Sequence, residues 1–156
     1  MFITYCMRNN MKIEINSLTL DDINCISENF SNDFDKFWSI NILKEDFNSE
    51  SSKYIVAKVD DKVVGIAGVK LILDEANIMN IITKVDKRNL GIGSFLLENL
   101  INLCKKNNCN SIFLEVNENN LPAIHLYDKF KFNRIGFRKK YYNNKDNAIL
   151  MELKLL

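Results

Sequence analysis

The segment Arg88-Asn89-Leu90-Gly91-Ile92-Gly93 decides the fold of this chain, because it joins an apolar run to an amphipathic one. The apolar run covers residues 78–83, and residues 94–106 then repeat apolar side chains at helical spacing. A second apolar run over 112–116 and the segment Asn120-Leu121-Pro122 follow. This succession predicts a strand, a glycine turn, a helix, a second strand and the start of a second helix.

The two glycines of this segment favour an anion-binding turn. Gly91 and Gly93 lack a Cβ, so a ligand can approach their backbone closely. The free N–H groups and the positive dipole end of the following helix suit phosphate or pyrophosphate. The Gly-x4-Gly-Lys-Ser/Thr pattern of nucleotide hydrolases is absent here, and Leu96 stands where a dinucleotide-binding turn has its third glycine. An ordinary glycine-rich turn between a strand and a helix is the alternative interpretation.

The pattern Arg88-x-x-Gly91-x-Gly93 resembles the acetyl-CoA pyrophosphate motif of the GNAT acetyltransferases. Other segments resemble one branch of that family, the RimI-type enzymes, which acetylate the N-terminal alanine of a small-subunit ribosomal protein. These segments are Leu73-Asp74-Glu75-Ala76, Leu114-Glu115-Val116, Asn120 with Ala123-Ile124, Leu126-Tyr127, and Arg138-Lys139-Lys140-Tyr141-Tyr142 with Ala148 and Met151. The resemblance covers residues 11–156 and keeps the order and spacing of the motifs.

The resemblance implies an α/β (α+β) fold of the GNAT type. Its single mixed, mostly antiparallel sheet would have about seven strands, flanked by about four helices and splayed between the fourth and fifth strands. Apolar alternation and turn residues place the strands near 12–16, 53–59, 62–73, 75–85, 111–117, 132–142 and 147–155. Gly65 and Gly68 predict a bulge or a close approach within the third of these strands.

Capping residues predict where the helices begin. Thr19 begins a helix that runs to about Phe30, Ser39 begins a helix over 40–47, and Asn120 begins the last helix. The helix that follows the glycine turn covers 90–106. The aromatic pair Phe37-Trp38 resembles the aromatic entry of the family's second helix. We expect it to anchor that loop, with a wall of the substrate cleft as the alternative.

By the same resemblance, acetyl-CoA is the cosubstrate and lies across the glycine turn. The residues implied to contact its pyrophosphate are Arg88, Asn89, Leu90, Gly91, Ile92, Gly93 and Ser94. Its pantetheine arm would bond to the strand backbone at Ile81, Ile82 and Thr83. Asn120 matches a position that contacts the cofactor, although capping of the helix alone explains it equally well.

Glu115 and Tyr127 match the family's catalytic base and acid. Glu115 lies among Phe113, Leu114 and Val116, so we expect an apolar setting, in which a carboxylate is costly unless it is satisfied or used. Its role would be to take a proton from the amine, directly or through water. The alternative interpretation is that Glu115 is a charged residue on a partly solvated face of the sheet. Tyr127 would protonate the coenzyme A sulfur. The alternative interpretation is that Tyr127 only packs in the core.

Composition narrows the remaining possibilities. The chain has 156 residues, 47% of them hydrophobic, which is enough for one domain with a sizeable core. A net charge of +1 gives no reason to expect nucleic acid, and no apolar run approaches the roughly 20 residues of a membrane span. The four cysteines form no Cys-x-x-Cys pair and there is one histidine, so we expect no metal. We expect a cytoplasmic monomer or weak dimer.

Two segments fall outside the main pattern. Residues 1–10 precede the matching region and carry no motif, so we expect either an N-terminal extension to a single domain over 11–156 or a true start at Met11. The cluster of Arg134, Arg138, Lys139 and Lys140 is expected to be a solvated strand face. Near the last strand, Asp146-Asn147-Ala148 replaces the family's Glu-Asp-Ala, and this loss of one acid weakens the assignment of a peptide acceptor.

Three functions are compatible with these patterns. The first is an N-terminal protein acetyltransferase that acts on ribosomal-protein alanine. The second is the same chemistry on a small-molecule amine, such as a polyamine or an antibiotic. The third is a non-catalytic module that binds acyl-CoA, and the presence of both Glu115 and Tyr127 speaks against it.

Overall fold

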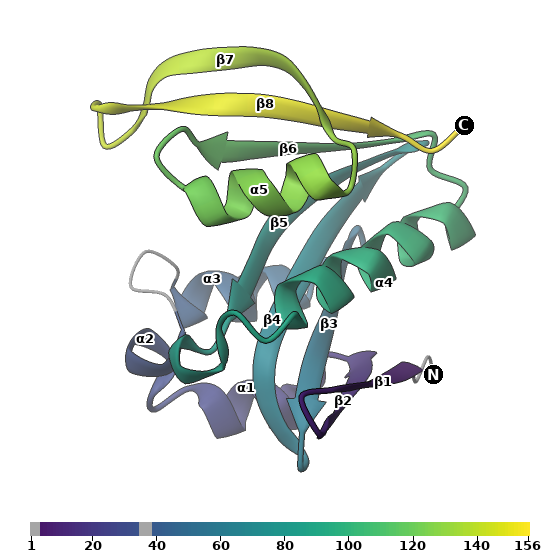
Figure 1. The fold of residues 1–156 in the computed structure, drawn as a ribbon, viewed down its shortest axis with the longest axis vertical. Helices are drawn as coiled ribbons and strands as arrows, with labels where there is room; N and C mark the ends of the chain where they lie inside the picture. Colours follow the sequence, from purple (N-terminus) through teal and green to yellow (C-terminus); the bar gives the residue numbers. More distant parts are fainter. Residues whose placement is uncertain (1–3, 35–38) are drawn as a thin grey trace.

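The computed structural model describes residues 4–34 and 39–156, which fold around one sheet (Figure 1). The strands are β1 (Thr4–Arg8), β2 (Met11–Ser17), β3 (Ser52–Val59), β4 (Lys62–Ile72), β5 (Glu75–Thr83), β6 (Ser111–Asn117), β7 (Asn133–Tyr142) and β8 (Asp146–Lys154). The helices are α1 (Leu20–Ile26), α2 (Phe30–Asp33), α3 (Ile40–Phe47), α4 (Ile92–Lys106) and α5 (Leu121–Lys129), and η1 (Val85–Lys87) is a 3-10 turn. The strand order is β1-β2-β3-β4-β5-β6-β8-β7, and only β5–β6 is a parallel pair.

This mixed, mostly antiparallel sheet confirms the expected fold, but it has eight strands where about seven were expected. The additional strand is β1, which lies within the expected extension 1–10. Asn9 and Asn10 both have positive φ, at 48° and 62°, as a tight two-residue hairpin turn requires. The chain therefore folds back at this turn, and β1 pairs along β2 from Arg8↔Met11 to Thr4↔Ile15.

The helix expected from Thr19 to about Phe30 is interrupted, so the described residues form five α-helices where about four were expected. Helix α1 ends at Ile26, and a separate short helix, α2, begins at Phe30. The hydroxyl of Ser27 donates to the carbonyl of Ile23 at 2.6 Å. A serine side chain that bonds back to the preceding turn in this way competes with the backbone ladder and favours a helix end.

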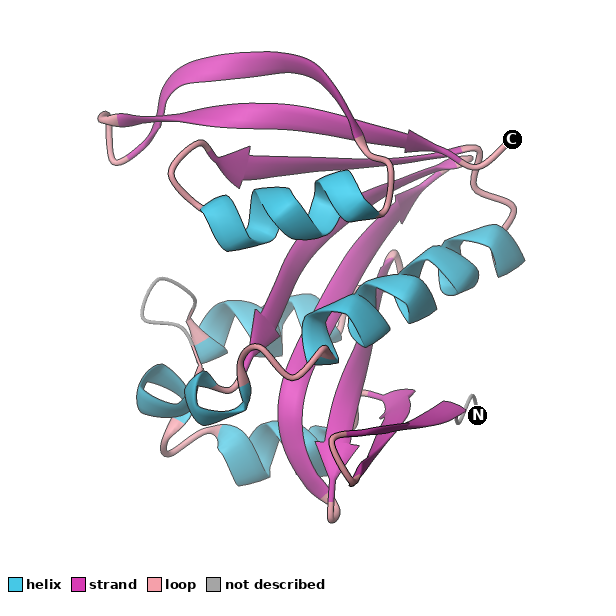
Figure 2. Ribbon diagram, in the orientation of Figure 1, coloured by secondary structure: helices cyan, strands magenta, loops and turns pink. Residues whose placement is uncertain are grey.

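Helices cover both faces of the sheet (Figure 2). In this view α4 and α5 lie in front of the sheet, and α1, α2 and α3 lie behind it (Figure 1). Successive side chains of a strand point to opposite faces of the sheet, so each strand contributes to both hydrophobic cores. On β3, Ile55 and Ala57 pack in the core between the sheet and α4, whereas Tyr54 and Val56 pack in the core on the opposite face. The expected stripe of α4 is fully buried at Leu96, Leu97, Leu100 and Cys104.

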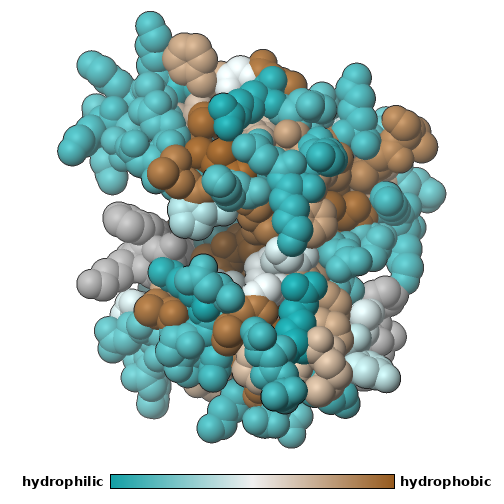
Figure 3. Space-filling view, in the orientation of Figure 1, coloured by the Kyte–Doolittle hydropathy of each residue, from teal (hydrophilic) through white to brown (hydrophobic). Residues whose placement is uncertain are grey.

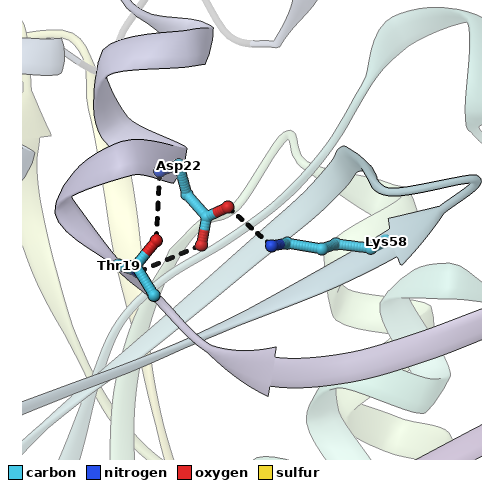
Figure 4. Close-up of polar contacts among 3 residues, drawn as sticks. All are labelled: Thr19, Asp22 and Lys58. Carbon is cyan, nitrogen blue, oxygen red and sulfur yellow. Dashed lines mark hydrogen bonds and ion pairs between the residues drawn. The ribbon is translucent and has the colours of Figure 1, made fainter.

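A buried polar contact fixes the start of α1 against the sheet (Figure 4). Thr19 caps the helix by accepting from the Asp22 backbone N–H at 3.1 Å, and the Asp22 carboxylate accepts from the Thr19 backbone N–H at 3.0 Å. The other oxygen of Asp22 pairs with Lys58 of β3 at 2.7 Å. The first turn of α1 is therefore held to the third strand by a charged pair.

The sheet splits between β5 and β6, as expected for the fourth and fifth strands counted from residue 11. These two strands pair only at Glu75, Ala76 and Asn77. On its other edge, β5 shifts register against β4 between Gly68 and Val69, which leaves Met79 as a bulge. From Ile78 onward β5 follows β4 and leaves β6, so one edge of β5 opens into a gap (Figure 1).

Gly68 makes the close approach that its position in β4 predicted. A Cβ at Gly68 would overlap the ring of Tyr54, which packs directly on the glycine. The Tyr54 hydroxyl donates to the Asp46 carboxylate at 2.5 Å and so ties α3 to the sheet. The register shift between β4 and β5 therefore begins at Gly68, the glycine on which the ring of Tyr54 packs.

Candidate active site

The glycine turn ends in an uncapped helix. Gly91 is the residue before α4 and has a φ of 80°, a left-handed conformation that an L-residue with a side chain adopts only with strain. Among the residues that the structure describes, no side chain caps this helix. The N–H groups of Ile92, Gly93 and Ser94 therefore remain available at the positive end of the dipole, which is the arrangement that binds phosphate groups.

A cleft, here called the turn cleft, runs from this turn between α4 and α5. It is lined by the end of β5 (81–83), by the turn and start of α4 (87–89 and 91–94), and by Asn120 and residues of α5. Among the residues that line it are the cations Lys87, Arg88 and Lys129, and none of its lining residues is an aspartate or a glutamate. Figure 3 shows this face of the molecule hollowed between α5 and the turn, with hydrophobic residues at its floor. The cleft suits a long ligand with an anionic end.

Arg88 lines the turn cleft but does not point its guanidinium at the helix end. Its Nε donates to the carbonyl of Thr83 at 3.4 Å, and its Nη2 donates to the carbonyl of Phe34 at 3.2 Å. The arginine thus links the end of β5 to the end of α2. The structure therefore gives Arg88 a structural role, and its contact with pyrophosphate stays a prediction of the motif.

A second cleft, here called the hairpin cleft, opens on the other side of the split. It is lined by β5 (78–81), β6 (114–117), the β7–β8 hairpin (141–143 and Asp146), and Ser31, Asn32 and Phe34 in and just after α2. Two carboxylates, Glu115 and Asp146, line it, with Arg88 as a cation on its wall. The Asn117 side chain donates to Asp146 at 3.1 Å, which fixes this acid at the hairpin. A cleft with carboxylates at its base suits an amine.

Glu115 lies on the β6 face expected from alternation, but its setting is polar. Its carboxylate pairs with Arg138 of β7, with 3.2 Å between Oε1 and Nη2. The hydroxyl of Tyr141 also bonds to it, and this hydrogen bond, together with the negative charge, raises the pKa of Tyr141. The expected apolar setting is therefore wrong: Leu114 and Val116 face the other side of β6, and the β7 hairpin brings polar groups to the carboxylate.

Tyr127 is both a core residue and a residue of the clefts. Only 7% of it is exposed, and its ring centroid lies 5.5 Å from that of Phe132. Burial raises its pKa strongly, and the nearby Tyr142 adds to the shift. A tyrosine with a raised pKa keeps its proton at neutral pH, so the hydroxyl remains available as a donor.

The two clefts meet at Tyr127. Ile81 of β5, Ala123 of α5, Asn120 and Arg88 line both clefts together with it. Asn120 caps α5, since its side chain accepts from the Ala123 backbone N–H at 3.3 Å, so capping is one of its functions. The structure therefore brings Glu115, Tyr127, the end of β5 and the glycine turn into one continuous groove.

Two features of this groove could not be located from the sequence. The basic cluster is the solvated face that was expected, since Arg134, Arg138, Lys139 and Lys140 are all exposed, but the ion pair of Arg138 with Glu115 was not foreseen. Lys140 has a positive φ of 51°, and the β7–β8 register shifts between Arg138 and Tyr142. This irregularity turns Tyr141 and Tyr142 into the hairpin cleft. Phe37 and Trp38, which were expected to anchor the loop before α3, with a wall of the cleft as the alternative, lie outside the described residues.

No group of three or more His, Cys, Asp or Glu side chains that could hold a metal ion occurs in the part of the chain that the structure describes. Within the same residues, no helix is long and apolar enough to cross a membrane. The four cysteines do not line either cleft, and Cys104 and Cys109 are buried beside each other.

The sheet is split, a helix without a side-chain cap begins at the split, and two clefts meet at a tyrosine. Together these features are typical of a transferase that joins an anionic acyl carrier to an amine. A model of the acetyltransferase (GNAT) family matches residues 23–132. A Bacillus subtilis protein provisionally named ribosomal protein bS18-alanine N-acetyltransferase is 31% identical over 90% of this chain and 94% of its own. The Salmonella typhimurium protein of that name is 33% identical over 69% of this chain and 76% of its own.

A solved structure is also similar over most of the chain. The crystal structure of the ribosomal-protein-S18-alanine N-acetyltransferase from Escherichia coli has a TM-score of 0.83 and 28% identity, and the match covers 92% of this chain and 94% of that one. The chain therefore belongs to the GNAT family of acetyltransferases, and it is an acetyltransferase.

Proposed function

We propose that this enzyme transfers an acetyl group from acetyl-CoA to the N-terminal α-amino group of a protein, with the N-terminal alanine of ribosomal protein bS18 as its acceptor. The observation that carries the proposal is the meeting of a basic cleft and an acidic cleft at Tyr127. The relatives named for bS18 acetylation support the choice of acceptor. A ribosomal acceptor would place the reaction in the cytoplasm.

Acetyl-CoA would occupy the turn cleft. Its pyrophosphate would accept from the free N–H groups over residues 89–94, where Gly91 and Gly93 allow close approach. Its pantetheine arm would lie along Ile81, Ile82 and Thr83, where β5 has left β6 and its edge is open to a surrogate strand. Asn120, which lines both clefts, would contact the arm near the thioester.

The acceptor amine would enter through the hairpin cleft. An α-amino group has a pKa of about 8, so most of it is protonated at neutral pH and must lose a proton before it attacks. Glu115 would take that proton, directly or through one water. The neutral nitrogen would then attack the thioester carbonyl, and the C–S bond would break as the tetrahedral intermediate collapses. The excess proton that the nitrogen carries after the attack would pass through water to the phenolate that Tyr127 leaves when it protonates the sulfur, which gives the amide and restores the tyrosine.

Tyr127 would complete the transfer by giving its proton to the leaving thiolate of coenzyme A. Its phenol is protonated at neutral pH, so a proton is available when the sulfur acquires charge. The transfer would be direct, because none of the cysteines lines either cleft and an acyl-enzyme would need a nucleophile there. Much of the rate would come from holding the two substrates together, a contribution of up to roughly 7–11 kcal/mol in ideal cases.

A comparison of acceptors tests this proposal. Thiol release from acetyl-CoA should be followed with a peptide copying the N-terminus of the organism's own bS18, the same peptide with its N-terminus blocked and a lysine added, and a polyamine. We expect the free N-terminal peptide to have by far the highest kcat/KM. Preference for the polyamine would assign a small-molecule acceptor, and absence of turnover with all three would favour a module that only binds acyl-CoA.

A further inference from the structure

An arginine from the first strand lies beside the glycine turn. Arg8 is the last residue of β1 and comes directly before the Asn9-Asn10 turn. The hairpin fixes its backbone, since Arg8 pairs with Met11 at the closed end of the β1–β2 ladder. This residue precedes the segment that the family model matches, so the motifs in 23–132 give no reason to expect it.

The side chain of Arg8 reaches from the sheet edge to the first turn of α4. A Cβ placed on Gly91 would overlap its Nη1 and would lie 3.1 Å from its Cδ. Its Cζ lies 6.0 Å from the centroid of the Phe95 ring, within the range of a cation–π contact. The guanidinium therefore rests between the turn residue without a side chain and an aromatic residue one turn into the helix.

The charge of Arg8 is at odds with its position beside a helix N-terminus. A helix N-terminus carries a partial positive charge, so a cation beside it is disfavoured unless an anion is present. Among residues 4–34 and 39–156, no carboxylate forms an ion pair with Arg8. Lys87, Arg88 and Lys129 add further positive charge along the neighbouring cleft.

We propose that Arg8 is a phosphate-binding residue for acetyl-CoA, donating from its guanidinium to a phosphate group held over the glycine turn. This inference rests on the proposed cofactor site. Arg88, the arginine of the motif, already donates to the carbonyls of Thr83 and Phe34, so Arg8 supplies a second guanidinium with no competing carbonyl partner in the described structure. A guanidinium presents a planar fork of donors that matches phosphate oxygens.

The test compares three full-length variants by calorimetric titration with acetyl-CoA. Arg8→Gln removes the charge, Arg8→Lys keeps it without the fork, and Lys12→Gln removes a charge from the same hairpin at a residue that pairs with Glu14 on the surface. We expect Arg8→Gln to raise the Kd about tenfold, as loss of a hydrogen bond to a charged group does. Arg8→Lys should lose less, and Lys12→Gln should bind like the wild type.

Repeating the titrations with dephospho-CoA, which lacks the 3′-phosphate, locates the contact. A loss that persists with dephospho-CoA assigns Arg8 to the pyrophosphate, and a loss confined to acetyl-CoA assigns it to the 3′-phosphate. Both results support the proposal. Wild-type affinity of a folded Arg8→Gln protein for both ligands would overturn it, whereas failure of the wild type to bind acetyl-CoA would instead overturn the cofactor site.

A measurement on the wild-type protein covers the case in which Arg8→Gln does not fold. The Nε–H resonance of Arg8 should shift on addition of coenzyme A, because a phosphate accepting from the guanidinium changes its hydrogen bonding. Adenosine, which has no phosphate, is the matched control and should leave the resonance in place. An Arg8 resonance that does not move at saturating coenzyme A would overturn the proposal.

Discussion

The two clefts differ in the part of the chain that builds them. In the turn cleft the groups that suit a ligand are backbone N–H groups at the start of α4, and the charged residues of its lining are the cations Lys87, Arg88 and Lys129. In the hairpin cleft the corresponding groups are side chains, with carboxylates from Glu115 and Asp146 and hydroxyls from three tyrosines. One cleft fits a phosphate-bearing carrier, and the other fits an amine.

This difference indicates how the enzyme separates binding from chemistry. A backbone site is fixed by the conformation of one short segment, so it holds the same cofactor in each turnover. A side-chain site depends on residues from β6, α5 and the β7–β8 hairpin, and in the proposed mechanism it would determine which amine is accepted. Substitutions in the turn cleft should therefore change cofactor affinity, and substitutions in the hairpin cleft should change turnover.

The largest effect is expected at Glu115, on the acceptor side. Glu115→Gln preserves the shape and an acceptor for Arg138 but removes the base, so kcat should fall by about 10²–10⁴ near pH 7. Activity should partly recover at high pH, where the amine loses its proton unaided. The check is a pH–rate profile with the N-terminal peptide, and a wild-type kcat with an unchanged profile would mean that another group takes the proton.

The next effect is expected at Tyr127, where the clefts meet. Tyr127→Phe keeps the ring against Phe132 and deletes the proton donor, so we expect a fall of about 10² in kcat with little change in acetyl-CoA affinity. Steady-state kinetics and calorimetry on the same preparation measure the two quantities. If kcat is retained, Tyr127 is a packing residue alone.

A smaller effect is expected at Gly93, on the cofactor side. Within the protein a Cβ at Gly93 has room, since the nearest protein atoms would be 3.7 Å and 3.9 Å away. Gly93→Ala should therefore keep the melting temperature, yet its methyl group would obstruct the phosphate and raise the Kd about tenfold. Gly91 is a less selective site for this test, because any side chain there meets both a φ of 80° and Arg8.

The smallest effect is expected far from both clefts. Asp22→Asn can still accept from the Thr19 backbone N–H but loses the ion pair with Lys58. Chemical denaturation should show a loss of about 1 kcal/mol in the free energy of unfolding. Both kcat and the acetyl-CoA Kd should remain at wild-type values. A change in either would show that the layer behind the sheet influences the groove.

The sequence predicted the turn cleft better than the hairpin cleft, because one short segment builds the first and several distant segments build the second. The turn is encoded locally: a strand, two glycines and an amphipathic helix within 29 residues, 78–106, predict uncapped N–H groups at one place. The splay could also be anticipated, because Gly68 marks the register shift. Local pattern and family resemblance together were therefore sufficient on this side.

The hairpin cleft depends on contacts between distant segments. Arg138 and Tyr141 approach Glu115 because β8 lies between β6 and β7, and because a positive φ at Lys140 breaks the alternation of β7. Neither the irregularity nor the pairing follows from the residue pattern, so the basic cluster was correctly expected to face solvent while its ion pair with Glu115 was missed. The edge strand β1 was missed for a similar reason, since the two asparagines of its turn were not taken as a hairpin signal.

The most direct test of this account is a calorimetric titration of acetyl-CoA into Gly93→Ala and Glu115→Gln, with kcat measured on the same samples at saturating cofactor. Separation of the clefts predicts opposite results: Gly93→Ala should bind about tenfold more weakly and keep its kcat, and Glu115→Gln should bind like the wild type and lose about 10²–10⁴ in kcat. Wild-type cofactor affinity in a folded Gly93→Ala protein, or a weakened affinity in Glu115→Gln, would contradict it.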